Sequence, residues 1–174
     1  MRSIILIGMM GCGKSSVGAL LSERLNLQFI DTDSLIEKRT GEGIFKIFSE
    51  SEERFRNLEQ KTICELQSLA TPSVIATGGG VVTIDGVPDI LRGLGHLIYL
   101  KATPVELTKR LINSNIKRPL LDEITTFGLL QQRVETILSS RSALYESSGL
   151  TIDTDSLTPG EVCERILSNP LIFP

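Results

Sequence analysis

The sequence is poor in cysteine and has no excess of positive charge. Cys12, Cys64 and Cys163 are widely spaced and match neither a disulfide framework nor a zinc-binding pattern. The formal net charge is −3, so nothing attracts the whole chain to nucleic acid or to an anionic membrane. Any site for an anion must therefore be built locally.

Long apolar runs are also absent, and no stretch approaches the length of a transmembrane helix. Met1-Arg2-Ser3 leads directly into a short apolar run, so we expect no signal peptide and a reduced, cytoplasmic protein. The 174 residues, 41% hydrophobic and 22% charged, suffice for one domain with a sizeable core. Because no repeat or low-complexity segment divides them, we expect a single domain over residues 1–174.

The most informative stretch extends from Ile4 to Val17. The apolar run Ile4-Ile5-Leu6-Ile7 is typical of a buried strand, and Gly8 to Ser15 match the phosphate-binding pattern G-x-x-x-x-G-K-[ST]. A helical pattern of apolar residues follows at once. The motif therefore lies between a strand and a helix, as a phosphate-binding loop must. A glycine-rich turn that carries a lysine by chance would not need this position, so we favour the phosphate-binding loop.

The residue types of this loop suit the binding of phosphate. Glycines at 8, 11 and 13 permit unusual backbone angles, so that successive N–H groups can point inward around an anion. The N-terminus of the following helix adds unpaired N–H groups and the positive end of its dipole. Lys14 can supply an ammonium to the β- and γ-phosphates, and Ser15 can offer a hydroxyl to Mg²⁺.

Short apolar runs alternate with helical patterns along the rest of the chain. Strands are predicted at residues 4–7, 29–30, 74–76, 96–100 and 150–152. A short helix is predicted at residues 44–49, and further helices at residues 52–69, 88–94, 104–112, 127–148 and 159–168. This alternation indicates an α/β fold whose parallel sheet is covered on both faces. Ligands of such sheets bind beyond the carboxyl ends of the strands, where Asp31, Asp33, Gly78–Gly80 and Asp153 fall. Residues 113–124 lose periodicity and form a predicted loop.

The phosphate loop indicates a nucleotide but not a reaction. GTP-binding switches recognise guanine with Asn-Lys-x-Asp, and this chain contains no Asn-Lys pair. Motor-type ATPases hold magnesium with an Asp that ends the third strand, where this chain has Thr77-Gly78. The nearest carboxylates are Asp31 and Asp33, which could orient magnesium and position an acceptor hydroxyl. A small-molecule kinase is therefore favoured.

A series of motifs, in order along nearly the whole chain, resembles the shikimate kinase family. They are Gly8-Met9-Met10-Gly11-Cys12-Gly13-Lys14-Ser15, Asp31-Thr32-Asp33, Phe55-Arg56 with Glu59, Gly78-Gly79-Gly80, Arg118-Pro119-Leu120-Leu121 and Arg141-Ser142-Ala143-Leu144-Tyr145. The resemblance implies a three-layer P-loop kinase fold, with a parallel five-stranded sheet in the order 2-3-1-4-5, helices on both faces and a mobile lid at about residues 113–124. It also implies ATP-dependent phosphorylation of the 3-hydroxyl of shikimate, with Mg²⁺, in chorismate and aromatic amino-acid biosynthesis.

The resemblance implies a role for each matching residue. ATP would be bound by Gly11, Cys12, Gly13, Lys14, Ser15, Ser16, Arg110, Arg118, Asp153 and Pro159. The substrate-binding region would be about residues 32–60. The residues that bind shikimate would be Asp33, Arg56, Gly78, Gly79, Gly80 and Arg141. Mg²⁺ would be held by Ser15, and by Asp31 through water, and the catalytic residues would be Lys14, Asp31 and Arg118. Arginine forks match the carboxylate of shikimate, and an acid matches its hydroxyls.

One segment departs from the family pattern. Ser51-Glu52 stands where relatives usually carry Gly-Glu, and the spacing from Phe48 is one residue short, so Arg54 could share the work of Arg56. Taken alone, Arg56 and Arg141 would be ordinary surface residues, and only the family pattern assigns them to a site.

The aromatic residues Phe48 and Phe55, with Leu58, are expected to pack rather than to touch substrate. Two other functions stay open. A kinase of the same fold could act on gluconate or a nucleoside monophosphate, which paired arginines do not exclude. The second alternative is a non-catalytic nucleotide-binding module, although such a module has no need of an acceptor site. The expected partners are ATP and shikimate, without nucleic acid or membrane, and the expected state is a monomer.

Overall fold

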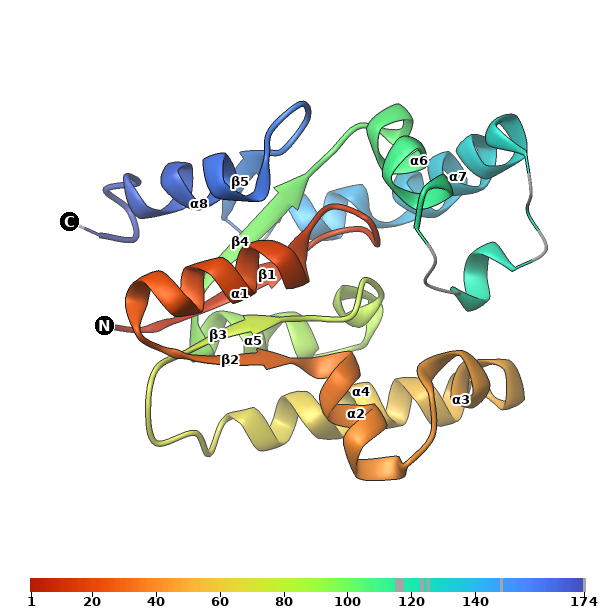
Figure 1. The fold of residues 1–174 in the computed structure, drawn as a ribbon. Helices are drawn as coiled ribbons and strands as arrows, with labels where there is room; N and C mark the ends of the chain where they lie inside the picture. Colours follow the sequence, from red (N-terminus) through yellow and green to blue (C-terminus); the bar gives the residue numbers. More distant parts are fainter. Residues whose placement is uncertain (115–117, 123, 125, 148, 174) are drawn as a thin grey trace.

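The strands and helices alternate as the sequence predicts. The structure is a computed structural model that describes residues 1–114, 118–122, 124, 126–147 and 149–173. In chain order the first half contains β1 (Ser3–Ile7), α1 (Lys14–Leu25), β2 (Gln28–Asp31), α2 (Thr32–Thr40), α3 (Ile44–Glu50), α4 (Glu52–Leu66) and β3 (Ser73–Ala76) (Figure 1). The second half contains η1 (Val81–Thr83), α5 (Val87–Leu94), β4 (Gly95–Lys101), α6 (Pro104–Ile112), η2 (Pro119–Leu121), α7 (Phe127–Glu146), β5 (Leu150–Asp153) and α8 (Pro159–Leu167).

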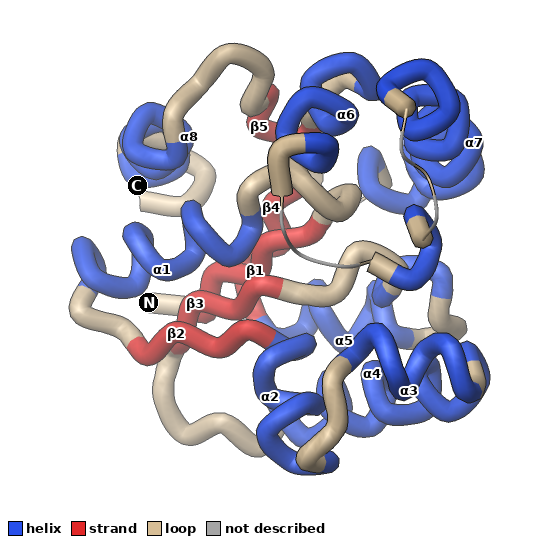
Figure 2. Tube along the Cα trace, turned by 45° about the vertical axis from the view of Figure 1, so that its right-hand side comes forward, coloured by secondary structure: helices blue, strands red, loops and turns tan. Residues whose placement is uncertain are grey.

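The strands form one parallel sheet in the order β2-β3-β1-β4-β5 (Figure 2). This confirms the predicted α/β fold and strand order. The central strand β1 is buried along its whole length, which is why its sequence is a continuous apolar run rather than an alternating one. Its Ile5 pairs with Ile75 of β3 on one side and with Leu97 of β4 on the other.

Helices cover both faces of the sheet and create three layers. α1 and α8 pack together over one face, and α4, α5 and α7 lie over the other (Figure 1). The main core fills the space between these layers, and Tyr99 and Tyr145 are the largest of its fully buried side chains. The carboxyl ends of β1, β2 and β3 consequently meet at one edge, with α2, α3 and α4 beside them.

The helices α2, α3 and α4 have a small core of their own. Ile36, Ile47 and Phe55 are buried against each other, and Ile44, Phe48 and Leu58 pack around them. Ser51 alone separates α3 from α4, and its hydroxyl accepts a hydrogen bond from the backbone N–H of Arg54 as the N-cap of α4. The serine that replaces the usual glycine therefore has a clear structural role.

The observed element ends differ slightly from the predicted ones. The predicted helix 52–69 ends at Leu66 and the predicted helix 127–148 ends at Glu146. The loop predicted at 113–124 contains the short helix η2, which starts at Pro119, whose fixed φ suits a first helical turn. Residues 115–117 and 123 of the predicted lid lie outside the described residues, and its mobility stays a prediction. Within the described residues, no helix has both the length and the apolar character of a membrane span.

Candidate active site

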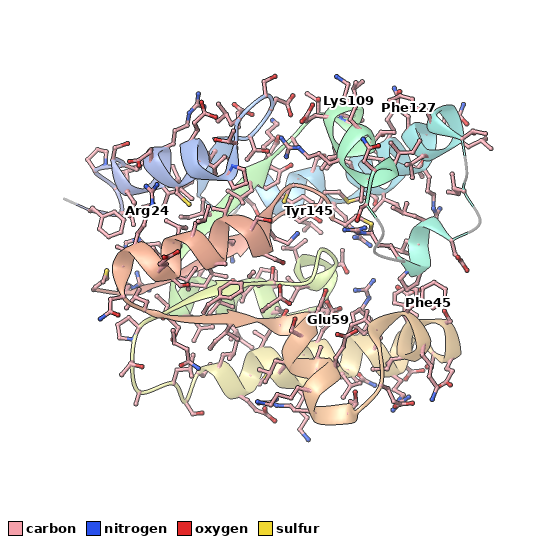
Figure 3. The ribbon with its side chains drawn as sticks, viewed as in Figure 1. Arg24, Phe45, Glu59, Lys109, Phe127 and Tyr145 are labelled. Carbon is pink, nitrogen blue, oxygen red and sulfur yellow. The ribbon has the colours of Figure 1, made fainter. Side chains whose placement is uncertain are left out.

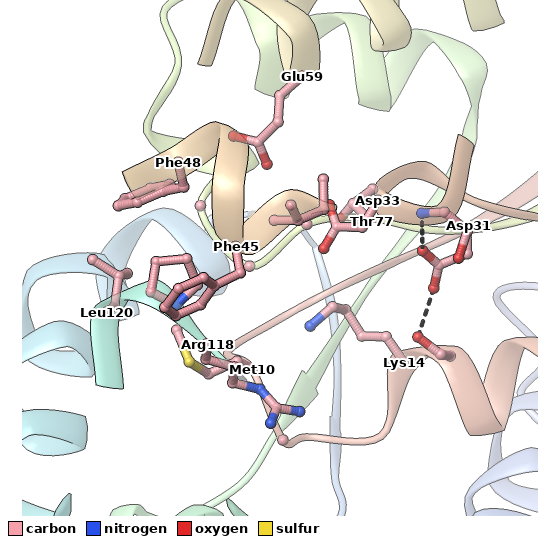
Figure 4. Close-up of a pocket in the computed structure, with 18 of the residues that line it drawn as sticks. Met10, Lys14, Asp31, Asp33, Phe45, Phe48, Glu59, Thr77, Arg118 and Leu120 are labelled. Carbon is pink, nitrogen blue, oxygen red and sulfur yellow. Dashed lines mark hydrogen bonds between the residues drawn. The ribbon is translucent and has the colours of Figure 1, made fainter. Parts of the chain in front are cut away.

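A cavity of about 620 Å³ lies beyond the carboxyl ends of β1, β2 and β3. This volume is in the range of sites that bind small molecules. Its walls come from the phosphate loop, from α2, α3 and α4, from the Gly78–Gly80 run, and from Arg110, Arg118 and Arg141. Figure 4 shows part of this lining. One chamber therefore joins the phosphate loop to the motifs predicted for the acceptor.

The phosphate loop has the backbone geometry that its glycines were expected to allow. Gly8, Gly11 and Gly13 have φ of 142°, 85° and 100°, a region that residues with a side chain rarely adopt. Gly13 is the N-cap of α1, and no side chain caps the N–H groups of the first turn. Those groups are consequently open to an anion in the cavity.

Lys14 is almost buried, and its ammonium holds the loop together. Its Nζ donates to the carbonyl of Gly8 at 2.8 Å and to that of Met9 at 3.1 Å. The same nitrogen lies 3.8 Å from the Sγ of Cys12. Figure 4 shows the ammonium pointing toward the cavity, so a phosphate there would gain a cation that the loop already holds in place.

Ser15 and Asp31 connect the start of α1 to the start of α2. The hydroxyl of Ser15 donates to Oδ2 of Asp31 at 2.6 Å, and Oδ1 of Asp31 accepts from the backbone N–H of Ser34 at 3.1 Å (Figure 4). Asp31 is thus the N-cap of α2, and this hydrogen bond fixes the orientation of its carboxylate. A hydroxyl and a carboxylate lie together beside the loop, and both are hard oxygen ligands.

Asp33 and Glu59 are buried acids with unsatisfied oxygens. Oδ1 of Asp33 and Oε1 of Glu59 have no hydrogen-bond partner among the described residues, although both are out of contact with solvent. Burial, with the nearby charge of Asp31, raises the pKa of Asp33 to about 6. Burial also raises the pKa of Glu59 to about 7, although Arg56 opposes this shift. Buried oxygens without partners are suited to accept hydrogen bonds from the hydroxyls of a ligand.

The glycines at 78–80 are required for space rather than for backbone angle. None of them has a positive φ. A Cβ on Gly78 would lie 2.3 Å from Oε1 of Glu59, and one on Gly80 would lie 2.1 Å from Nη1 of Arg56. The absence of a Cβ at Gly78 and Gly80 thus allows the side chains of Glu59 and Arg56 to lie at the cavity wall.

Arg56, not Arg54, reaches the cavity. Nη1 of Arg56 donates to Oε2 of Glu59 at 2.6 Å, and Nη2 donates to Oε1 of Glu52 at 2.9 Å. Arg54 instead forms ion pairs with Glu42 and Glu50 and does not line the described walls. The altered spacing before Phe55 has therefore left Arg56 in the site.

Phe48 and Phe55 have a double role that the sequence did not indicate. Each ring centroid lies 5.5 Å from the guanidinium carbon of Arg56, and both rings line the cavity. They also pack against each other edge to face. Besides packing as expected, the two rings line the cavity, because the small core of α2, α3 and α4 is itself a wall of it. That they do not touch substrate stays a prediction. Leu58 packs without lining the cavity.

Three further arginines border the cavity. Arg110 donates to the carbonyl of Cys12 and to both oxygens of Thr154, which joins the phosphate loop to the end of β5. Nη1 of Arg118 donates to the hydroxyl of Ser114 at 3.2 Å, and burial lowers the pKa of its guanidinium. Nη1 of Arg141 donates to the carbonyl of Gly79 at 3.3 Å. Cations thus surround the chamber in a chain that is acidic overall.

Known proteins share both the sequence and this architecture. The family model described as shikimate kinase matches residues 10–169. The chain belongs to the shikimate kinase family. The shikimate kinase of Thermodesulfovibrio yellowstonii is 42% identical over 171 residues, covering 96% of this chain and 94% of the relative. That of Azobacteroides pseudotrichonymphae is 38% identical over 168 residues, covering 96% and 98%.

Solved structures agree with this assignment to the shikimate kinase family. Shikimate kinase from Acinetobacter baumannii in complex with shikimate has a TM-score of 0.88 and 35% identity, covering 98% of this chain and 93% of that one. A gluconokinase from Sinorhizobium meliloti has a TM-score of 0.58 and 21% identity, covering 94% and 87%. The latter likeness shows a shared fold alone.

Most residues that the shikimate kinase motifs singled out come together at the cavity. Its walls include Gly11, Gly13, Lys14, Ser15, Ser16, Asp31, Asp33, Arg56, Gly78, Gly79, Gly80, Arg110, Arg118 and Arg141. Cys12, Asp153 and Pro159 are not among the described wall residues. Cys12 contributes its backbone carbonyl to Arg110, whereas Asp153 ends the edge strand β5 and Pro159 begins α8. A border around adenine by Asp153 and Pro159 stays a prediction.

The sequence did not assign roles to several residues that shape this shikimate kinase site. Thr32 accepts from the backbone N–H of Gly78, and Thr154 accepts from Arg110. Glu59 and Tyr145 belong to quoted motifs, but no role followed from the pattern. The spacing of Glu59, three residues after Arg56 on one helix, was a usable signal, because such pairs face each other. No comparable local signal identifies Thr32, Thr154 or Tyr145.

Proposed function

We propose that this chain transfers the γ-phosphoryl group of ATP to the 3-hydroxyl of shikimate, giving shikimate 3-phosphate and ADP. The observation that carries the proposal is the single chamber that joins the phosphate loop to a pocket of arginines and buried acids. Transfer between two bound molecules needs them held side by side with water excluded. The chamber would hold them side by side, and closure of the predicted lid would exclude water.

The ATP end of the chamber is the phosphate loop. The N–H groups at the start of α1 and the ammonium of Lys14 would hold the phosphates, with Ser16 in the first turn beside them. Arg110 would border the adenine, together with Asp153 and Pro159. Arg118 would add its charge to the transferring group.

Mg²⁺ fits the residues beside the loop. Ser15 would bind it directly and Asp31 through water, and the ion would neutralise charge on the phosphates. The described residues contain no group of three or more His, Cys, Asp or Glu side chains that could hold a metal. This accords with Mg²⁺, which usually takes one or two protein oxygens and completes its shell with water and phosphate.

The acceptor end suits a hydroxylated carboxylic acid. Arg56 and Arg141 lie on α4 and α7 and would bind the carboxylate of shikimate from two sides. Asp33 would accept from the ring hydroxyls, and its raised pKa lets it take up a proton near neutral pH. The cavity wall has no side chains at Gly78, Gly79 and Gly80, and this would let the ring of shikimate approach the backbone. We further propose a cytoplasmic monomer that binds neither nucleic acid nor membrane.

ADP release tests the function directly. The protein is given Mg-ATP with shikimate, with gluconate or with nucleoside monophosphates in separate reactions. We expect rapid, saturable ADP release in the reaction that contains shikimate, and in neither of the other two reactions. Turnover with gluconate or a nucleotide instead would assign the chain to another kinase of this fold, and nucleotide binding without turnover would indicate a binding module.

Arg141→Ala is expected to impair use of the acceptor and to spare ATP. Loss of one charged partner of the carboxylate removes roughly 1.5–3 kcal/mol, so kcat/KM for shikimate should fall by about 10- to 100-fold. Arg56→Ala should behave alike. Arg54→Ala is the matched control, because its ion pairs lie outside the cavity, and it should change kcat/KM by less than about 2-fold. Equal damage to the KM of ATP and of shikimate would move Arg141 out of the acceptor site.

Closure of the predicted lid has a signature in hydrogen exchange. Peptides that cover residues 113–124 are expected to exchange more slowly when ADP and shikimate are both bound than when the protein is free. Peptides from α5, which carries none of the residues proposed to bind ATP or shikimate, serve as the reference. If ligands leave exchange in 113–124 unchanged, the lid hypothesis is wrong.

A further inference from the structure

Tyr145 is a fully buried residue of α7 whose hydroxyl points at the acceptor end of the cavity wall. Its ring stacks on that of Tyr99, with ring centroids 5.0 Å apart and an angle of 19° between the planes. Its hydroxyl donates to the carbonyl of Gly79. Figure 3 shows Tyr145 in the interior beneath the phosphate loop. Packing alone would be served by phenylalanine, so the hydroxyl calls for a separate explanation.

The same carbonyl also receives Arg141. Nη1 of Arg141, one helical turn before Tyr145, donates to it at 3.3 Å, a long contact. Two side chains of α7 thus share one backbone oxygen at the cavity wall.

Gly79 itself lies against the phosphate loop. A Cβ at this position would be 3.2 Å from the backbone nitrogen of Met10 and 3.5 Å from the carbonyl oxygen of Gly8. The peptide that Tyr145 and Arg141 hold therefore lies at the junction between the nucleotide side and the acceptor side of the chamber.

We propose that Tyr145 is a positioning residue that acts through Gly79 and keeps the guanidinium of Arg141 directed at the carboxylate of the acceptor. The inference rests on the proposed phosphorylation of shikimate. It assigns a role to a side chain that does not itself line the described cavity walls.

The physical basis is that the carbonyl of Gly79 and the carboxylate of the acceptor compete for the guanidinium of Arg141. The phenol of Tyr145 donates to the carbonyl of Gly79, so this oxygen needs no close contact from Arg141, whose Nη1 lies 3.3 Å away. Burial keeps the pKa of this phenol well above its usual range, so the donor proton is present throughout the working pH range. Without the hydroxyl, the carbonyl would depend on Arg141 alone and would draw the guanidinium away from the substrate.

Tyr145→Phe tests the proposal while preserving the stacked ring. We expect the KM for shikimate to rise by roughly 3- to 10-fold, since a neutral hydrogen bond is at stake, whereas the KM for ATP and kcat should change by less than about 2-fold. Tyr99→Phe is the matched control, because it removes a hydroxyl from the partner ring, which is not among the described donors to Gly79. It should leave both KM values unchanged.

A double-mutant cycle separates positioning from general support of the fold. In an Arg141→Ala background the residue through which Tyr145 acts is gone, so Tyr145→Phe should no longer raise the KM for shikimate. An undiminished effect in that background, or an equal rise in the KM for ATP, would overturn the proposal. If the unmodified protein does not turn over shikimate, the proposed function fails first; if it does and Tyr145→Phe has no effect, only this inference fails.

Discussion

Lys14→Met is expected to lower kcat by about 10²-fold or more, because electrostatic stabilisation of the transferring phosphoryl group dominates this chemistry. Methionine preserves the length of the side chain and removes its charge. The ammonium donates to the carbonyls of Gly8 and Met9 in the absence of ligand, so it is held at the loop before the phosphates arrive. The measurement is steady-state ADP release at saturating ATP and shikimate.

Lys61→Met is the matched control for Lys14→Met. Lys61 is exposed on α4 and does not line the described cavity, so its substitution should leave kcat within about 2-fold. Since Lys14 also ties the loop together, the stability of both variants should be compared by thermal unfolding. A folded Lys14→Met protein with near-normal turnover would rule out the mechanism.

The parts of the fold that could be predicted are those encoded locally. The strand, loop and helix from Ser3 to Leu25 form one continuous pattern, so the phosphate loop was identified without knowledge of any distant contact. The helix predicted at 159–168 begins at Pro159 in the structure, where Thr158 and Glu161 form a capping box. The order of the strands, in contrast, came from the resemblance to a family, because alternation alone leaves several orders open.

The parts of the site that escaped prediction depend on contacts between distant segments. Glu59 and Asp33 were each visible as acids, but their raised pKa values follow from burial that only the packed α2 and α4 create. The neighbours of the glycines at 78–80 come from α2, from α4 and from the phosphate loop, and no local pattern reveals them. Tyr145 lies 66 residues from the carbonyl that it binds, a separation at which local patterns carry no information.

Arg118→Ala is expected to lower kcat by about 10²-fold with little change in either KM. Arg118 precedes η2, where Pro119 stiffens the chain and Leu120 lies beside Phe45 and Phe48 of α3 (Figure 4). In the described structure Arg118 contacts Ser114 and lines the same cavity as the phosphate loop, where the phosphates are proposed to bind. An arginine that meets the phosphoryl group mainly in the transition state raises kcat without tightening the ground state.

The kinetic split distinguishes this role from simple ATP binding. If Arg118 held ATP equally in the ground state and the transition state, its loss would raise the KM for ATP and leave kcat intact. Arg92→Ala is the control, since Arg92 pairs with Asp89 on the exposed side of α5, and it should match the unmodified protein in both constants. A rise in KM for ATP at constant kcat would therefore assign Arg118 to binding and leave Lys14 as the main cation acting on the transferring group.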